Sequence, residues 1–271
     1  MPSWRRAALI ALGLSAAACR TGYDYRGPGP RYAGTYLDSA AKSCAPCTLR
    51  IVSFNTNFAR DVEGAIALFT SDPAIRDPDI LLLQEMDAAG TETLAKALRR
   101  SFVYYPAIFH RRTQRDVGNA VLSRWPIVED VKLVLPNPSR YAETHRIATA
   151  ATLLVGASKV RVYSTHLGTF ADIAPSARQA QLRFIIADAA KYPFVIIGGD
   201  LNDSDVGLVA QGAGYSWPTQ YGPRTHELGR WDHIFLKGAE SPDSAAAGTI
   251  LDSRGVSDHH PVWALAILQP E

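Results

Sequence analysis

The chain has 271 residues, of which 47% are hydrophobic, and this is enough to bury the core of one domain of α/β size. It carries 28 Lys and Arg residues against 26 Asp and Glu residues. Two of the basic residues, Arg5 and Arg6, lie in an N-terminal leader without acidic residues, so the rest of the chain is close to neutral. This composition argues against tight, non-specific binding to long polyanions.

Residues 1–18 have the order of a signal peptide. Arg5 and Arg6 precede the largely apolar run Ala7–Ala18, whose twelve residues are too few to span a bilayer but suit a signal-peptide core. The small residues before Cys19 resemble a bacterial lipoprotein cleavage box, although Ala16 stands where that box usually has Leu. We therefore expect lipidation at Cys19 and an exported bacterial membrane lipoprotein that faces the periplasm or the cell exterior. Ordinary cleavage after an A-x-A site is the alternative.

Residues 19–48 are expected to form a lipid-anchored tether. The stretch 20–43 is rich in Gly, Pro, Tyr, Ser and Ala and has no periodicity, as is typical of a linker. With Cys19 lipidated, Cys44 and Cys47 remain as an even pair, which predicts a small structural disulfide. A redox C-x-x-C motif is the alternative, but no thioredoxin-like βαβ pattern surrounds it.

The folded domain is expected over residues 49–271. Its first half is predicted to contain helices at Asp61–Phe69 and Thr91–Arg100 and strands at Leu49–Phe54, Asp79–Leu83, Phe102–His110 and Asn119–Arg124, with a polar loop at Arg111–Asp116. Its second half is predicted to contain helices at Pro175–Lys191 and Ser204–Ala210 and strands at Arg146–Val155, Lys159–Ser164, Phe194–Ile197, Trp231–Leu236, Ala245–Leu251 and Pro261–Leu268. In Lys159–Ser164, valines alternate with Arg161 and Tyr163, which predicts a half-exposed strand. The many strands favour an α/β fold with two sheets packed face to face and helices outside.

The stretch Phe194–Asp203 reads F-V-I-I-G-G-D-L-N-D and places polar groups at the end of a buried strand. Four apolar residues predict a central strand buried on both faces, and Gly198 and Gly199 allow close approach of the backbone. Asp200 and Asn202 follow at the strand's carboxyl end, where binding groups collect in α/β proteins. In isolation a polar turn would be the simpler interpretation.

The same arrangement recurs along the chain. Acidic, amide or imidazole groups follow predicted strands at Asn55, Glu85, His166, Asp200, Asn202, Asp232 and in the run S-D-H-H-P at 257–261. Buried carboxylates are costly unless they are paired, hydrogen-bonded or bound to a metal. Because the set is rich in oxygen and has no thiol, it suits one or two Mg²⁺ or Mn²⁺ ions better than zinc.

The order of these motifs resembles the endonuclease/exonuclease/phosphatase superfamily, which includes deoxyribonucleases, abasic-site endonucleases, neutral sphingomyelinases and inositol-phosphate phosphatases. The matching segments, from about Leu49 to Leu268, are S-F-N-T-N, L-L-Q-E-M, G-N-A-V-L-S-R-W-P-I, S-T-H-L-G, G-G-D-L-N-D, R-W-D-H-I-F and S-D-H-H-P. The resemblance implies a four-layer αββα sandwich of two mixed β-sheets, as in deoxyribonuclease I, and metal-assisted hydrolysis of phosphoesters.

The resemblance also implies a metal site and a water-activating group. Glu85 would be the main metal ligand, with Asn55 and Asp258 completing or supporting the polar shell of the ion. Asp200 would orient or deprotonate the attacking water. Asn202 would hold the nucleophile or a phosphate oxygen.

Two histidines receive roles in the same way. His259 would act at the phosphate, oriented by Asp232 through its other ring nitrogen. His166 would sit opposite and donate to the phosphate or the leaving oxygen. The orienting partner of His166 stays open between Asp116, Asn119 and Glu143.

Asn119 and Arg146 are candidate substrate-binding residues, although an arginine before a strand equally suits a structural ion pair. The other histidines are interpreted as non-catalytic: His260, which points to the opposite face from its neighbour, and His110, His145, His226 and His233.

The superfamily does not fix the substrate. Near-zero charge and the expected membrane anchor favour an exported, monomeric phosphodiesterase or phosphatase that acts on a small or lipid phosphoester. The segment R-R-T-Q-R at Arg111–Arg115 favours the alternative, an exported endonuclease of the deoxyribonuclease type with a nucleic acid substrate. A binding module that has lost catalysis is a third hypothesis, which the filled motif positions disfavour.

Overall fold

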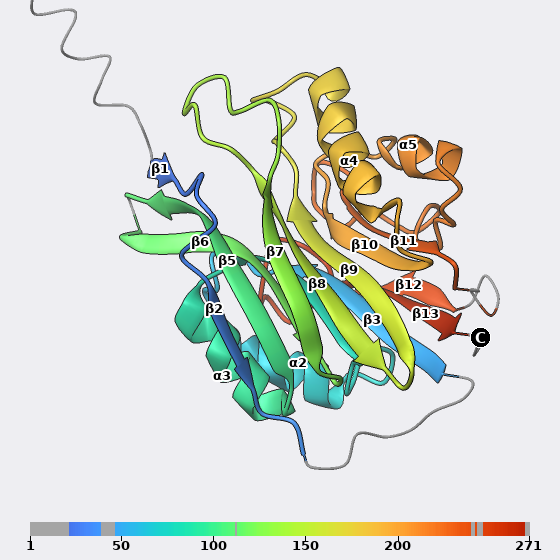
Figure 1. The fold of residues 1–271 in the computed structure, drawn as a ribbon. Coiled ribbons are helices and arrows are strands. Elements are labelled where there is room, and N and C mark those ends of the chain that lie inside the picture. Colours follow the sequence, from blue (N-terminus) through green and yellow to red (C-terminus); the bar gives the residue numbers. More distant parts are fainter. Residues whose placement is uncertain (1–21, 39–46, 112, 240–241, 243–245, 269–271) are drawn as a thin grey trace, which may run out of the picture.

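Two mixed β-sheets lie face to face in the computed structural model of the protein, with helices on both outer faces (Figure 1). The structure describes residues 22–38, 47–111, 113–239, 242 and 246–268. This arrangement confirms the predicted αββα sandwich.

The first sheet runs in the order β1-β5-β6-β4-β3-β13-β12, and β2 also pairs with β5. Its strands are β1 (Gly22–Asp24), β2 (Tyr32–Thr35), β3 (Cys47–Asn55), β4 (Ile80–Met86), β5 (Ser101–His110), β6 (Arg115–Ser123), β12 (Ala247–Thr249) and β13 (Val262–Leu268). The second sheet runs in the order β11-β10-β9-β8-β7, built from β7 (Ile127–Val134), β8 (Ile147–Val155), β9 (Ser158–His166), β10 (Phe194–Asp200) and β11 (Asp232–Lys237). The pairs β3–β4 and β9–β10 are parallel, and the other pairs are antiparallel.

Three apolar clusters hold the four layers together. The largest lies between the sheets and contains Ile51 and Leu82 from the first and Val162 and Ile196 from the second. A second cluster packs the helices α2 (Val62–Ser71) and α3 (Ala88–Leu98) on the first sheet, and a third packs α4 (Pro175–Ala189) and α5 (Gly207–Gly212) on the second. Alternate residues of the inner strands therefore face two different apolar layers, and burial of both faces is the main stabilising contribution.

The helices begin where the sequence supplies caps. At the start of α2, the Asp61 carboxylate accepts a hydrogen bond from the Gly64 N–H, and at the start of α3 the Asp87 carboxylate accepts one from the Gly90 N–H. Pro175 occupies the first turn of α4. These signals place the three longer helices within a few residues of their predicted bounds.

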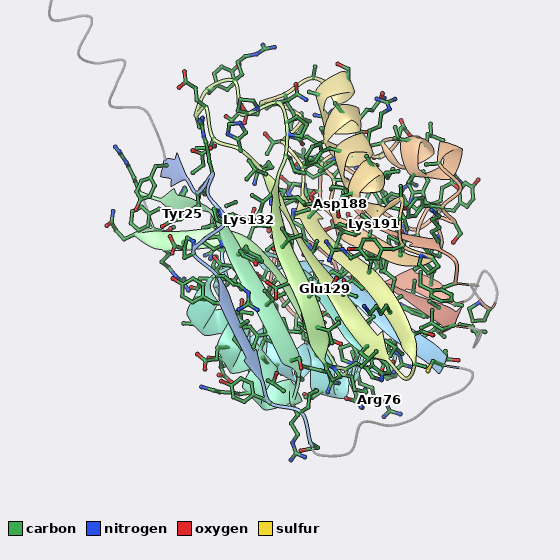
Figure 2. The ribbon with its side chains drawn as sticks, in the orientation of Figure 1. Tyr25, Arg76, Glu129, Lys132, Asp188 and Lys191 are labelled. Atoms are coloured by element: carbon green, nitrogen blue, oxygen red, sulfur yellow. The ribbon has the colours of Figure 1, made fainter. Side chains whose placement is uncertain are left out.

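The N-terminal stretch differs from its prediction as a tether without regular structure. Within residues 22–38, β1 and β2 both pair with β5. Side chains fix this segment further: the guanidinium of Arg31 donates to both carboxylate oxygens of Asp130 on β7, and Lys132 Nζ donates to the Gly29 carbonyl. Figure 2 shows Tyr25 beside Lys132, which is 6.0 Å from the tyrosine ring. These backbone and side-chain partners, which composition alone does not reveal, make residues 22–35 part of the folded domain.

Strand β9 is buried on both faces, so the prediction of a half-exposed strand is wrong. Arg161 and Tyr163 face α4, where Asp188 accepts a hydrogen bond from the Tyr163 hydroxyl at 2.7 Å and pairs with Arg161 at 3.4 Å. Asp188 is labelled in Figure 2. The polar atoms of these two side chains are thus satisfied under a helix, which the alternating pattern cannot distinguish from exposure to water.

Two further local predictions need correction. The polar loop expected at Arg111–Asp116 is shorter, because β6 begins at Arg115. No strand was predicted at β7, an edge strand in which Glu129, Asp130 and Lys132 interrupt the apolar pattern.

Some predictions fall outside the described residues. These are the signal peptide, Cys19 and Cys44; Cys47 is disulfide-bonded, but its pairing with Cys44 stays a prediction. Among the described helices, none has the length and hydrophobicity needed to cross a membrane.

Candidate active site

The register of the second sheet lines up three of the predicted residues. Asp200, the last residue of β10, is paired with His166 at the end of β9 on one side and with Asp232 at the start of β11 on the other. Gly199 makes this pairing possible, because a Cβ atom there would lie 1.8 Å from the Thr165 carbonyl oxygen.

Glu85 comes from the facing sheet, where β4 contains an irregularity between Leu83 and Met86. The residue has a φ of 55°, in the left-handed region that is costly for a residue with a Cβ. A bulge of this kind turns a side chain out of the strand alternation. It places the Glu85 carboxylate 3.7 Å from His166 of the second sheet.

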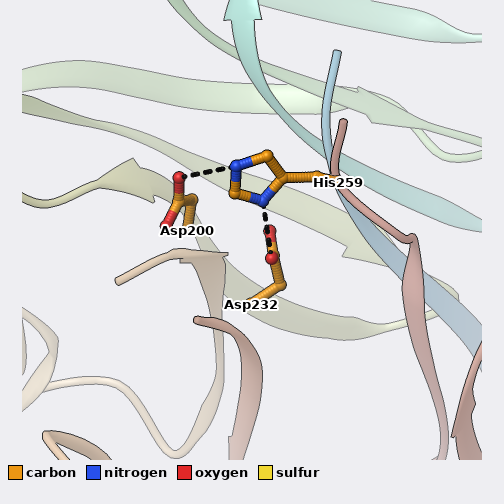
Figure 3. A group of neighbouring side chains, drawn as sticks. All are labelled: Asp200, Asp232 and His259. Carbon is orange, nitrogen blue, oxygen red and sulfur yellow. Dashed lines mark hydrogen bonds and ion pairs between the residues drawn. The ribbon is translucent and has the colours of Figure 1, made fainter. Parts of the chain in front are cut away.

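His259 lies between two carboxylates (Figure 3). Its Nδ1 is 2.8 Å from Asp232 Oδ2, and its Nε2 is 3.6 Å from Asp200 Oδ2. Asp232 is fully buried, and the described residues offer no hydrogen-bond partner to its Oδ1. The Asp232 carboxylate is thus within hydrogen-bonding distance of the imidazole, and its unshared charge acts mainly on that ring.

The pKa values follow from this burial and pairing. Burial, and then the charge of Asp232, raise the pKa of Asp200 to about 7. Burial alone would lower the pKa of His259, but the carboxylates of Asp232 and Asp200 outweigh it and raise this pKa to about 10. His259 is therefore an imidazolium at neutral pH in the arrangement described, beside a carboxyl group poised to exchange a proton.

His166 is neutral, and its contacts define its tautomer. Burial and then the positive charge of Arg146 lower the pKa of His166 well below its usual value. The Arg146 guanidinium has only donors, so His166 Nδ1, at 3.3 Å from Nη1, must accept. The ring proton is then on Nε2, which lies 3.3 Å from Asp200 Oδ2.

The described contacts bear on the three candidate partners of His166. Asp116 accepts from the Tyr25 hydroxyl, Asn119 donates to the Ile147 carbonyl, and Glu143 is exposed. Arg146 and Asp200 orient the ring in their place, an outcome that sequence spacing could not indicate.

The two asparagines sit beside Asp200. Asn55 Nδ2 donates to Asp200 Oδ2 at 3.1 Å, and the backbone N–H of Asn202 donates to Asp200 Oδ1 at 3.0 Å. The Asn202 side chain donates to the Leu167 carbonyl, so its amide nitrogen is already occupied. Both asparagines thus fix the Asp200 carboxylate.

The residues around Glu85 fit a hard divalent cation. Burial raises the pKa of Glu85, and the charge of the exposed Asp258 raises it further, whereas Arg146 and a hydrogen bond from Asn55 oppose the rise. A bound cation would offset this burial cost, and the donor oxygens are the kind that Mg²⁺ and Mn²⁺ prefer.

Asp200, Asp232 and His259 form a second group, whose ligand atoms lie within 4.8 Å of one another. In the second group the imidazolium already carries a compensating positive charge, so Glu85 is the better candidate to hold a cation.

A cavity of about 210 Å³ opens beside the network. Its lining includes Glu85, Arg146, His166 and Asn119. It also includes Phe58, His110, Asn137, Ser139, Thr144 and His145. A substrate whose phosphoryl group meets the network can place a substituent here, and both candidate substrate-binding residues are in position to contact it.

Sequence reasoning missed two histidines near the site. The ring of His226 stacks on Trp231 at 4.6 Å and lies 4.8 Å from the ring of His259. His145 lines the cavity and is bonded to Asp24. Neither lies in a motif: His226 is in the loop before β11, and His145 is in the segment just before β8.

Comparisons with known proteins support the fold described above. No curated protein matches the chain. An endonuclease/exonuclease/phosphatase from Beutenbergia cavernae has a similar structure, with a TM-score of 0.67 and 19% identity over 82% of this chain and 72% of that chain. TDP2 from D. rerio, solved in complex with a single strand DNA product, gives a TM-score of 0.62 and 20% identity over 81% of this chain and 98% of its own. At these identities the likeness shows the fold.

The family is shown by a match along the sequence. The model of the Endonuclease/Exonuclease/phosphatase family matches residues 52–259. This range contains every residue of the charged network described above and does not include the N-terminal segment. Members of this family are hydrolases that act on phosphoesters. The chain belongs to the endonuclease/exonuclease/phosphatase family.

Proposed function

We propose that this chain is an exported, divalent-metal-dependent hydrolase that acts on small or lipid phosphoesters as a phosphodiesterase or phosphatase. The observation that carries the proposal is the buried network of Asp200, Asp232, His259 and His166 beside the Glu85 carboxylate. Such a concentration of coupled charges is costly to the fold and is typical of catalytic sites.

The protein groups divide the work of hydrolysis. A cation held by Glu85, Asn55 and Asp258 would polarise a phosphoryl oxygen and offset negative charge in the transition state. Asp200, whose pKa of about 7 suits a base at neutral pH, takes a proton from the attacking water as the new O–P bond forms and the ester P–O bond breaks.

The basic groups stabilise the charge that develops. His259 faces the phosphoryl group as a cation because Asp232 holds its other nitrogen. Arg146 both accounts for the tautomer of His166 and supplies a fixed positive charge at the cavity wall.

The size of the cavity and the position of the N-terminus support a small or lipid substrate. Gly22 pairs with His110, which lines the cavity. Cys19 precedes Gly22 by three residues, a reach of about 10 Å in extended chain. Lipidation of Cys19 would therefore hold the site close to the membrane surface.

An endonuclease is the second candidate. It is supported by the single strand DNA product bound to D. rerio TDP2. The basic segment at 111–115 gives it less support than the sequence suggests, because Arg115 is paired with the Asp87 carboxylate.

One comparison of substrates tests the proposal. The purified protein, treated with EDTA and then supplied with Mg²⁺ or Mn²⁺, is assayed on bis-p-nitrophenyl phosphate, sphingomyelin vesicles and plasmid DNA. We expect metal-dependent turnover of the first two, with little cleavage of the plasmid. Preferential cleavage of DNA would favour the endonuclease, and no turnover in any arm would favour a binding module.

A further inference from the structure

The N-terminal segment contributes to the wall of the active site through a pair of residues. Asp24, at the end of β1, accepts a hydrogen bond from the backbone N–H of His145 at 3.0 Å and lies 2.7 Å from its Nδ1. Both side chains are mostly buried, with exposed fractions of 13% and 19%. The pair joins positions 121 residues apart, and Asp24 lies outside the matched family region.

The position of Asp24 is fixed by its surroundings. It pairs in register with Ile108 on β5, and the following residue, Tyr25, donates its N–H to the Ala107 carbonyl. The Tyr25 hydroxyl donates to Asp116 at 2.7 Å. A carboxylate held in this way can orient an imidazole.

His145 in turn faces the substrate cavity. Because its Nδ1 is held by Asp24, Nε2 is the ring nitrogen left for a ligand, and no hydrogen bond from a described residue occupies it. The same cavity contains Glu85 and Arg146, so a group bound at Nε2 belongs to a molecule whose phosphate reaches the catalytic network.

Uncharged polar residues in the cavity lining indicate what the group is. Thr144, Ser139 and Asn137 line the same cavity as His145 and carry uncharged hydrogen-bonding side chains. Uncharged donors and acceptors suit hydroxyl groups, which both donate and accept. At about 210 Å³ the space suits one compact substituent.

We propose that His145, positioned by Asp24, binds a hydroxyl group of the substrate's alcohol portion, so that the enzyme prefers phosphoesters of polyols. This inference rests on the proposed phosphoester hydrolase. Asp24 is a positioning residue, and residues 22–25 are part of the active site. A purely structural role for the pair, as a fastener of β1, would leave ligand preference unchanged.

The test compares myo-inositol 1-phosphate with cyclohexyl phosphate, which share a six-membered ring and a phosphate and differ in their hydroxyl groups. Calorimetry measures the binding of each to the purified protein with Mn²⁺, and turnover of bis-p-nitrophenyl phosphate is measured in parallel. We expect the wild type to bind the inositol compound about tenfold more tightly, the effect of about one net hydrogen bond.

Variants distinguish a role of Asp24 in positioning His145 from a purely structural role in holding β1 in place. His145→Phe and Asp24→Asn are expected to bring the ratio close to one. Arg31→Gln is the matched control, because it removes another side-chain link of the N-terminal segment, the one to Asp130, which does not line the cavity. This variant is expected to keep the wild-type ratio of the two binding affinities. His145→Gln retains one hydrogen-bonding group, is expected to give an intermediate ratio, and decides the matter if His145→Phe does not fold.

Two results would overturn the inference: a wild-type ratio near one, or an unchanged ratio in the folded His145 variants. Absence of turnover by the wild type would instead refute the proposed hydrolase function, and the ratio of the two binding affinities could still be measured.

Discussion

Replacement of Asp232 by Asn tests the electrostatic basis of the site. The change keeps the size of the side chain but removes the charge that lies 2.8 Å from His259 Nδ1. The pKa of His259 is raised from 6.5 to about 10, and one unit of pKa corresponds to about 1.4 kcal/mol. The carboxylates and the opposing effect of burial together favour the imidazolium by a net amount of about 5 kcal/mol.

Most of this preference should disappear with the charge of Asp232. Because burial then lowers the pKa of His259, we expect a neutral imidazole at pH 7 and a loss of turnover of about 10²- to 10⁴-fold. NMR titration of ¹⁵N-labelled histidine in EDTA-treated protein measures the pKa, and hydrolysis of bis-p-nitrophenyl phosphate measures turnover. A pKa that remains near 10 with turnover within threefold of wild type would refute the reasoning.

Four further perturbations extend the test. Glu85→Gln should raise the Mn²⁺ concentration needed for half-maximal activity by tenfold or more, because it removes the buried anionic donor, and a metal titration of activity measures this. Gly199→Ala should destabilise the fold by about 1–3 kcal/mol in urea unfolding, since its Cβ would meet the Thr165 carbonyl, and wild-type stability would contradict the close approach. His233 is buried as a neutral ring between the Trp217 N–H and the Asp203 carbonyl, and burial lowers its pKa to about 4. Because protonation therefore favours the unfolded state, the free energy of unfolding should fall by about 3 kcal/mol between pH 6.5 and 4. His233→Gln should largely remove this loss. Cys19→Ser should release the protein into the soluble exported fraction with unchanged activity, as fractionation and assay would show, and a wild-type protein already soluble with another mature N-terminus would contradict lipidation.

The sequence predicts those features that local patterns determine. Apolar runs followed by polar groups located the ends of β4, β9 and β10, and the strand register then brings His166, Asp200 and Asp232 into one row. Motif order also singled out Glu85 as a candidate site residue. Its left-handed backbone, which turns the carboxylate toward His166, has no signature in composition.

Features that depend on contacts between distant segments could not be predicted. Arg161 and Tyr163 have the alternation of an exposed face, but α4 covers them and Asp188 satisfies their polar atoms. Asp24 lies in a stretch with the composition of a linker, and only its pairing with β5 brings it to His145. The tautomer of His166 follows from the position of Arg146. The sequence alone did not decide whether this arginine contacts the substrate or forms a structural ion pair.

The most direct measurement of the central claim is the turnover of bis-p-nitrophenyl phosphate by wild type and by Asp200→Asn, each with EDTA and with saturating Mn²⁺. Asn keeps the shape of residue 200 but cannot take a proton from water. The account predicts turnover only for the wild type with Mn²⁺ and a loss of at least about a hundredfold in Asp200→Asn, with the fold intact by circular dichroism. Metal-independent hydrolysis by the wild type, or near-normal turnover by the folded variant, would contradict it.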